Sequence, residues 1–366
     1  MGTLQILRGA AFHEVTEHMC STRIQRPFVG LLAVFLLCFF PFTAPLHAAS
    51  LDEGNTAKLV AGAKKEGKML WYATLVAADA DRLLKRFQEK YPFIKAELYR
   101  TGDDGMMTRI MAEAQAKRPA FDVVMITGIA GEVLKKKGLT AKYLSPERKF
   151  FPEGSRDHEG YWTDIYMNLY SIGYNTKLVS RQEAPKTWAD LANPKWKKRM
   201  GMDTKSYYWF AVMLKSLGEE KGREFMKKLA SQEIQFRTGQ PLITQLMAAG
   251  EVSIGIALYN QVVEEMKTKG GAVEWVSIEP LIPQIHPLSV AAQAPHPNAA
   301  RLFIDFMLSR EGQEMLAGFS RIPSRSDVDP LIPRLKKGLT IMPFDFSIVD
   351  DYDRYIKLYR ELLLKK

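Results

Sequence analysis

The apolar positions that follow residue 50 alternate between short continuous runs, which predict strands, and positions three or four apart, which predict helices. Up to residue 126 the predicted order is helix 57–66, strand 68–73, helix 79–91, strand 95–100, helix 106–114 and strand 122–126. We expect Asp79 to cap the second helix and Pro92 to end it. Strand–helix units in this order predict a parallel sheet, with ligands bound beyond the carboxyl ends of its strands.

The segment 149–163 differs in composition, because it contains few aliphatic residues, and it predicts the approach to a domain crossover. A second alternating set follows: strands 166–174 and 199–202, helices 206–217 and 220–230, strand 234–237, helix 242–249, strand 253–258, helix 261–269 and strand 272–278. A Pro-rich passage at 280–287 then precedes strand 288–292, so we expect the chain to return there to its first part. Two crossovers predict a double hinge with a cleft between two lobes.

The predicted fold class is therefore α/β, with two lobes, two crossover hinge strands and a ligand cleft between the lobes. The predicted first lobe is discontinuous and comprises 49–162 plus 280–330, and the second lobe comprises 163–279. A C-terminal helical segment, 331–366, with apolar positions at helical spacing between 355 and 362, is expected to pack on a lobe.

Residues 1–48 have the pattern of a signal peptide. Arg23 and Arg26 precede the apolar run 28–40, and small residues up to Ala48 follow it, so we place cleavage after Ala48. The run is too short to span a bilayer comfortably, which disfavours the alternative of an uncleaved anchor. Cleavage removes both cysteines of the chain, Cys20 and Cys38, and leaves a periplasmic protein without thiol chemistry.

The rest of the chain carries no motif that predicts a catalytic residue, a metal site or a cofactor. The segment 62–68 resembles a phosphate-binding loop, but Met69 stands where a hydroxyl must reach Mg²⁺, so we interpret it as a helix end capped by Gly67. Only three histidines remain after the leader: His158, His286 and His296. The net charge is +10, from 51 basic and 41 acidic residues, but the basic runs lack interleaved aromatics, so we expect no nucleic-acid partner.

The best candidate for solute recognition is the cluster 203–210, at a strand-to-helix junction. Unpaired backbone N–H groups there attract an anion, and aromatic side chains offer a face with a polar edge. Asp203 either contacts the ligand or caps the helix. Some of the aromatics must fill the core instead. The candidate ligand-binding residues in this cluster and at other strand ends are Thr74, Thr127, Asp203, Ser206, Tyr207, Trp209, Arg237, Tyr259 and Asn260.

The sequence blocks 61–68, 187–197, 246–252 and 294–313 resemble the family 1 extracellular solute-binding proteins, in the ferric-iron-type branch that serves ABC importers. The resemblance extends to about residue 329. It implies a two-lobed, hinged periplasmic binding protein of the class with two crossovers (type 2). It also implies a small-molecule ligand and, as partner, an ABC permease in the inner membrane; we expect the receptor itself to be a monomer.

One departure from this branch bears on the ligand. Its ferric binders hold iron with two adjacent tyrosines, a histidine and a glutamate, and in the corresponding positions this chain has Asn260 and Gln261, Val76 and Thr127. Amide, aliphatic and hydroxyl groups do not replace the anionic ligands of a trivalent cation. We expect an anionic solute or a metal chelate, and an aromatic cation held by Tyr207, Trp209 and Asp203 stays open.

Two other function classes stay open beside a solute receptor. One is a secreted enzyme that uses the same cleft, against which the lack of a recognisable nucleophile–base pair weighs, and the other is a ligand-sensing partner of a membrane receptor. For the receptor, we expect Tyr207→Ala or Arg237→Ala to weaken stabilisation by the ligand.

Overall fold

The computed structural model describes residues 51–364. The predicted signal peptide, with Cys20, Cys38 and the cleavage site after Ala48, lies outside the described residues. Among the helices of the described part, none has the length and hydropathy needed to cross a membrane.

Three parallel strands form the first part of the sheet, in the spatial order β2, β1, β3. They are β1 (Lys68–Ala73), β2 (Lys95–Arg100) and β3 (Val123–Met125), and the first two begin and end at the predicted residues. The helices around them are α1 (Leu51–Glu66), α2 (Ala77–Lys90), α3 (Asp103–Gln115) and α4 (Gly128–Lys136). Gly67 follows α1 with φ of 66°, a left-handed conformation that favours glycine, which confirms a capped helix end at this place.

Helix α2 begins two residues before its predicted cap. Its N-cap is Val76, which forms no side-chain cap, and Asp79 lies within the first turn. The carboxylate of Asp79 instead receives a hydrogen bond of 2.7 Å from the guanidinium of Arg321. The prediction that Asp79 caps this helix is therefore wrong, because an ion pair with a residue distant in sequence holds its side chain.

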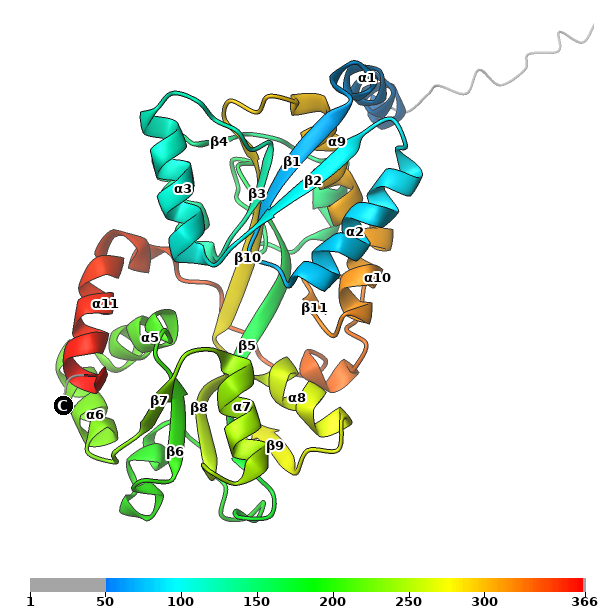
Figure 1. The fold of residues 1–366 in the computed structure, drawn as a ribbon. Coiled ribbons are helices and arrows are strands. Elements are labelled where there is room, and N and C mark those ends of the chain that lie inside the picture. The colour runs from blue at the N-terminus through cyan, green and yellow to red at the C-terminus, as the bar shows by residue number, and fades with distance from the viewer. Residues whose placement is uncertain (1–50, 365–366) are drawn as a thin grey trace, which may run out of the picture. The chain divides into compact units, whose positions relative to one another are not determined.

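Two long antiparallel strands, β5 (Thr163–Asn175) and β10 (Pro283–Ala291), run side by side between the two parts of the sheet (Figure 1). Every position of both strands is buried. β10 also pairs with β3, whereas β5 also pairs with β8 (Ile254–Tyr259) in the other part. The two strands thus carry both crossings that the sequence predicts.

The Pro-rich passage is a strand rather than a loop. β10 begins at Pro283, whereas the sequence pattern places the strand start at Leu288. Proline cannot donate to a strand ladder, but the pairing register with β5 shifts between Ile285 and Pro287. An irregularity of this kind accommodates a residue without an N–H group inside a buried strand.

The second part of the sheet follows the order β5, β8, β6, β7, with β9 also paired to β5. Its further strands are β6 (Met200–Asp203), β7 (Gln235–Arg237) and β9 (Val273–Val276). Its helices are α5 (Tyr207–Leu217), α6 (Glu219–Ala230), α7 (Gln240–Ala249) and α8 (Asn260–Thr268). The predicted elements of this part are confirmed, with ends displaced by no more than three residues; the largest displacement is at the start of β5.

Two helices after β10, α9 (Pro297–Leu308) and α10 (Arg310–Gly318), pack on the first part and were not predicted from the sequence pattern. The carboxylate of Glu66, at the end of α1, accepts hydrogen bonds from the backbone N–H groups of Asn298 (3.0 Å) and Ala299 (2.8 Å). A side chain from another helix thus caps α9, which no local pattern reveals. Two short strands complete the sheet, β4 (Thr140–Ala141) and β11 (Ile322–Pro323).

The chain ends in the 3₁₀ turn η5 (Phe346–Asp351), helix α11 (Tyr352–Tyr359) and the π-helical turn η6 (Arg360–Leu364). Helix α11 and turn η6 pack against α5 and α6 of the second lobe, whereas η5 packs against α4 of the first lobe (Figure 1). The Tyr359 hydroxyl donates a 2.5 Å hydrogen bond to the backbone carbonyl of Asp203, and the rings of Tyr208 and Phe344 stack at 4.3 Å. The segment is thereby fixed beside the strand end that carries Asp203. Other 3₁₀ turns are η1 (Pro146–Phe150), η2 (Ala189–Ala192), η3 (Pro194–Trp196) and η4 (Pro333–Leu335).

Candidate functional site

A cavity of about 740 Å³ lies between the two lobes, within the size range of sites for small molecules. The first lobe contributes residues from 102–107 and 127–133, and the second contributes residues from 203–208 together with Gln240 and Tyr259. The crossover strands contribute Tyr170 and Gln284, and the C-terminal segment contributes residues from 349–356. Both lobes, both crossover strands and the C-terminal segment therefore supply the walls.

Most of the cavity wall consists of strand ends and the first turns of the helices that follow them. The connections β2–α3, β3–α4, β6–α5, β7–α7 and β8–α8 all contribute, as expected for carboxyl ends of parallel strands. None of these five helices has a side-chain hydrogen bond at its N-cap. The polar groups at the starts of these five helices therefore lie around the same cavity.

On the first lobe, Asp103 and Asp104 occupy the first turn of α3. The Thr127 hydroxyl donates a 2.7 Å hydrogen bond to Asp103 Oδ2. Burial raises the pKa of Asp103, and the hydrogen bonds from Thr127 oppose this rise. Thr127, predicted as a direct ligand contact, thus lines the cavity and also positions a carboxyl group that the sequence did not single out.

On the second lobe, Asp203 is buried at the end of β6 and accepts a 3.0 Å hydrogen bond from the backbone N–H of Lys205. Burial raises its pKa, while hydrogen bonds from the backbone N–H groups of Lys205 and Gly239 lower it. Gln240, the first residue of α7, is 7% exposed and donates from Nε2 to the carbonyl of Ala257 at 3.2 Å. Its Oε1 is a buried acceptor that has no hydrogen-bond partner in the described part of the chain.

Five tyrosines line the cavity: Tyr170, Tyr207, Tyr208, Tyr259 and Tyr352. The hydroxyl groups of Tyr170 and Tyr259 lie 3.5 Å apart, and their rings are 5.0 Å apart. Burial raises the pKa of the Tyr170, Tyr259 and Tyr352 hydroxyl groups. These side chains are therefore neutral near pH 7, and they offer aromatic faces and hydroxyl groups rather than phenolates.

An ion pair between Lys205 and Asp104 crosses the cavity between the lobes. Lys205 Nζ of the second lobe lies 2.8 Å from Asp104 Oδ2 of the first lobe. Both side chains are exposed, at 54% and 85%, so the pair is solvated and weak on its own. It links the α3 start to the β6–α5 connection and depends on the distance between the lobes.

The C-terminal segment forms a wall that sequence reasoning missed. Tyr352, Asp353 and Ile356 of α11 line the cavity, whereas Tyr355 and Leu358 of the same helix are buried against the second lobe. Helical spacing in the sequence indicated the buried face of α11. The positions of α11 that line the cavity complete a site formed mainly by other elements, and helical spacing does not reveal such a role.

Of the nine candidate residues, the structure brings four together at the cavity: Thr127, Asp203, Tyr207 and Tyr259. The remaining five do not line it: Thr74, Ser206, Trp209, Arg237 and Asn260. Thr74 is half-buried at the end of β1, and Arg237 is exposed, with Nη1 bonded to the carbonyl of Phe236 at 2.8 Å.

Three of the candidates outside the cavity lining are buried. Trp209 is fully buried and packs edge-on against Trp188, with ring centroids 5.1 Å apart. Asn260 is also fully buried and donates to the carbonyl of Leu335 at 3.2 Å. Ser206 is 1% exposed at the N-cap of α5. Their residue types matched a binding site, but the way their helices pack places them inside the second lobe.

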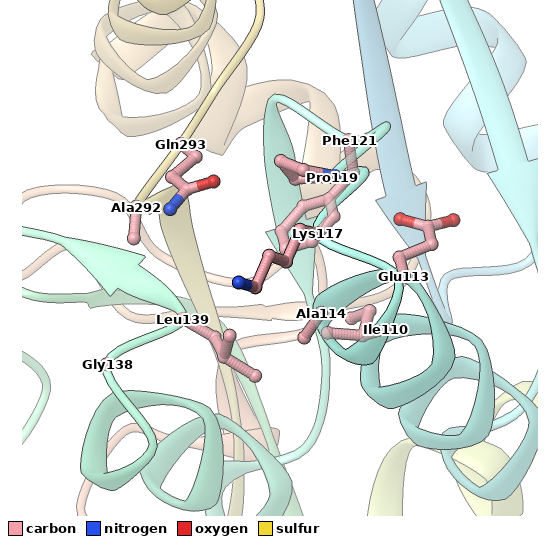
Figure 2. Close-up of a pocket in the computed structure, with 10 residues that line it drawn as sticks. All are labelled: Ile110, Glu113, Ala114, Lys117, Pro119, Phe121, Gly138, Leu139, Ala292 and Gln293. Atoms are coloured by element: carbon pink, nitrogen blue, oxygen red, sulfur yellow. The ribbon is translucent and has the colours of Figure 1, made fainter.

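A second cavity, of about 360 Å³, lies within the first lobe between α3, the turn after α4 and the end of β10 (Figure 2). Its charged lining residues are Glu113 and Lys117. The Glu113 carboxylate already accepts hydrogen bonds from Tyr72 (2.6 Å), Arg109 (2.9 Å) and the N–H of Ala120 (3.1 Å). This cavity therefore offers fewer free polar groups than the one between the lobes.

The positions that correspond to ferric ligands in the resembling branch do not form a ligand set here. Asn260 is bonded as described above, the Gln261 amide donates to Asn168, and Val76 is exposed on the surface. Among the described residues, no group of three or more His, Cys, Asp or Glu is arranged to hold a metal ion.

Solved structures with the same architecture include iron-bound HitA from Pseudomonas aeruginosa, with TM-score 0.73 and 22% identity over 81% of this chain and 99% of that chain. Another is the periplasmic binding protein AfuA from Actinobacillus pleuropneumoniae with fructose-6-phosphate bound, with TM-score 0.71 and 22% identity over 82% of this chain and 99% of that chain. Likenesses at this identity show the fold, which is the two-lobed fold of periplasmic binding proteins.

In sequence, the chain is 26% identical over 281 residues to a protein of Haemophilus influenzae described as uncharacterized, across 71% of this chain and 80% of the other. A family model described as "Bacterial extracellular solute-binding protein" matches residues 119–350. This match covers more than half of the chain, including both crossover strands and most of the cavity wall. The chain therefore belongs to the family of bacterial extracellular solute-binding proteins.

Proposed function

We propose that this protein is the periplasmic receptor of an ABC importer. In this proposal a signal peptide at 1–48 directs export, and the receptor acts as a monomer. It closes its lobes around a small solute, presents the closed form to a permease in the inner membrane, and releases the solute chemically unaltered. The proposed lobes are 49–162 plus 280–330 and 163–279, and 331–366 is a C-terminal segment that packs on them.

The observation that carries the proposal is a cavity whose opposite walls belong to two lobes that β5 and β10 connect. A change of backbone angles in two strands alters the distance between the walls without disturbing either core. The Lys205–Asp104 ion pair exists only when the lobes are close, so it favours a closed form. Closure excludes water, so a few hydrogen bonds to a solute provide affinity.

Small-angle scattering tests this proposal. Native mass spectrometry of the purified protein first identifies any solute that it retains, which is then removed by partial unfolding and dialysis. We expect the radius of gyration to fall when the solute is added back, and the mass of the solute to be the same before and after binding. An unchanged scattering profile, or conversion of the solute to another compound, would contradict the proposal.

A matched pair of variants locates the site. Tyr207 lines the cavity after the end of β6, whereas Arg237 ends β7, the next strand in sequence, and lies outside the lining. Tyr207→Ala should reduce the rise in melting temperature that the solute produces, because that rise grows with solute concentration over Kd. The structure makes Arg237→Ala the control, although its residue type suggested an anion contact. Equal loss in both variants would argue against the cavity as the site.

A further inference from the structure

The charged side chains that line the cavity between the lobes are mainly acidic. Five carboxyl groups line it, from Asp103, Asp104, Asp203, Asp350 and Asp353. Among the described residues of the lining, Lys205 is the single basic one, and it is bonded to Asp104. The chain as a whole has a net charge of +10, so the charge of the cavity lining is opposite in sign to that of the chain.

Two of these carboxyl groups form no ion pair within the described residues, although the charge of Lys205 lowers the pKa of both. Asp104 is paired with Lys205 and Asp350 with Lys136, and both are exposed at the rim. Asp103 and Asp203 come from opposite lobes, and no ion pair joins either of them to a basic side chain of the described chain. Asp203 is buried and Asp103 is half-buried. A bound cation stabilises carboxylates that are withdrawn from water in this way.

The electrostatic influence of these two groups reaches the aromatic wall. The charge of Asp203 contributes to the raised pKa of Tyr170, the charge of Asp103 to that of Tyr352, and both charges to that of Tyr259. The two carboxyl groups therefore act on the same space as the tyrosines. Tyrosine faces attract cations through the ring quadrupole, and more strongly when water is excluded.

Gln240 provides an independent observation. Its side chain is buried and lines the cavity, and its Oε1 is an acceptor without a partner in the residues that the structure describes. An acceptor of this kind is satisfied by a solute that brings an N–H or O–H donor. It does not favour a phosphate or carboxylate oxygen, which is itself an acceptor.

The helix N-termini around the cavity do not make it favour an anionic solute. Carboxyl groups of the chain itself occupy the first turn of α3, and Asp203 accepts the backbone N–H groups of Lys205 and Gly239 before α5 and α7. An anionic solute would have to displace these internal anions or lie beside them, and Lys205, the single basic side chain of the described lining, is already paired with Asp104. The expectation of an anionic solute, drawn from unpaired N–H groups in the sequence, therefore meets an opposing set of charges.

We propose that the cavity between the lobes binds a small organic cation, with Asp103 and Asp203 facing its charge from opposite sides and the cavity tyrosines enclosing its apolar part. Gln240 Oε1 accepts a hydrogen bond from a donor on the same solute. The inference rests on the proposed receptor function and names the chemical class of its cargo.

Thermal unfolding and calorimetry with defined probes test this inference. The cations are choline and benzyltrimethylammonium, and the reference is the uncharged carbon analogue of choline, in which a tert-butyl group replaces trimethylammonium. We expect the better of the two cations to raise the melting temperature and to bind at least tenfold more tightly than the uncharged analogue. Asp103→Asn and Asp203→Asn should each weaken the cation at least tenfold and leave the analogue unchanged, because asparagine keeps an acceptor oxygen for the native hydrogen bonds.

The matched control is Asp81→Asn, the same change at an exposed position of α2 outside the cavity lining, which should have no effect. The inference is overturned if the uncharged analogue binds as tightly as choline, if neither cation changes the melting temperature, or if the two cavity variants behave like the control. It is also overturned if fructose-6-phosphate or ferric citrate binds in preference. Lobe closure on either of those probes in the scattering experiment would keep the receptor function while rejecting a cationic cargo.

Discussion

The two crossover strands and the cavity that they adjoin contain the same kinds of buried polar group, but in different states. In the crossing, Asp164 is fully buried and accepts hydrogen bonds from the backbone N–H of His286 (2.7 Å) and the hydroxyl of Ser324. The ring of His286 stacks on Tyr166 at 4.2 Å and lies 3.2 Å from its carbonyl. At the cavity, Gln240 keeps an acceptor without a partner among the described residues, and Asp103 and Asp203 accept hydrogen bonds but form no ion pair there.

The difference is whether the chain itself supplies the partner of a polar group that lies where a solute can reach it. A polar group that the chain satisfies by itself stabilises one arrangement of the backbone. A polar group that is buried but left unsatisfied lowers the stability of the empty protein, and it becomes satisfied when a solute arrives. We therefore expect changes in the crossing to alter folding and changes in the cavity to alter binding.

The largest expected effect is the pH dependence of the crossing. Burial raises the pKa of Asp164 from its ordinary value of 3.8 to about 7. The folded state holds this proton more tightly than the unfolded state, so the contribution of Asp164 to stability is complete below pH 3.8 and is lost as the pH rises through 7. The loss is about 4 kcal/mol, at 1.36 kcal/mol for each pKa unit.

Urea unfolding of the wild type and of Asp164→Asn from pH 4 to pH 8 measures this effect. The variant should gain stability relative to the wild type as the pH rises. Burial lowers the pKa of His286 to about 3, which produces the opposite dependence at acidic pH, but it does so in both proteins and cancels in the difference. A constant difference across the pH range would contradict the assignment.

The next largest effect is expected at Gln240. Gln240→Leu removes the bond to the Ala257 carbonyl and also the unpaired acceptor, and these two changes offset each other in the free energy of unfolding. Binding of the retained solute should weaken by about 1–2 kcal/mol, since its donor loses an acceptor in a dry site. Calorimetry and urea unfolding of the same variant measure the two quantities. A large loss of stability with unchanged Kd would place Gln240 with the structural groups.

A smaller effect is expected from the ion pair that joins the lobes. Lys205→Met should weaken the closed form by about 0.2–1 kcal/mol at low salt, because both partners are solvated. The radius of gyration of the solute-free protein should increase in the variant at low salt and match the wild type at high salt, where the pair is screened. An increase that persists at high salt would show that the aliphatic stem of Lys205, rather than its charge, contributes to closure.

The smallest effect is expected in the cavity within the first lobe. Gln293 is exposed at its edge (Figure 2), and Gln293→Ala should change both stability and solute binding by less than about 0.5 kcal/mol. Calorimetry with the retained solute measures the binding. A tenfold change in Kd would require a second site for solute on the first lobe.

The sequence predicted the elements of the fold well because their signals are local. Strands 68–73 and 95–100 are recognised from runs of apolar and alternating residues, and the helices of the second lobe from their spacing. Two predictions from the sequence were wrong. Asp79 forms an ion pair with Arg321 instead of capping a helix, and β10 begins in the passage where prolines suggested a loop. In both places a partner distant in sequence decided the outcome.

The candidate site was predicted in part for the same reason. Strand ends before helices identified Thr127, Asp203, Tyr207 and Tyr259 as cavity residues, since the sheet brings its carboxyl ends together. The same criterion also selected Trp209 and Asn260, which are buried in the second lobe. It did not select Asp103, Gln240 or Tyr352, whose roles depend on the lobe opposite or on the C-terminal segment.

By itself the sequence determined which stretches form strands and helices, that two crossings divide the chain into lobes, and at which ends of the strands a solute would meet polar groups. The tertiary structure alone decided which of those groups face the solute and what charge they present. Successive residues of a helix point about 100° apart, so Tyr207 lines the cavity beside the ring of Tyr359, whereas Trp209, two positions further along α5, is buried against Trp188. The net charge of the cavity lining also depends on carboxyl groups brought together from three distant parts of the chain. No local pattern of residues predicts that net charge.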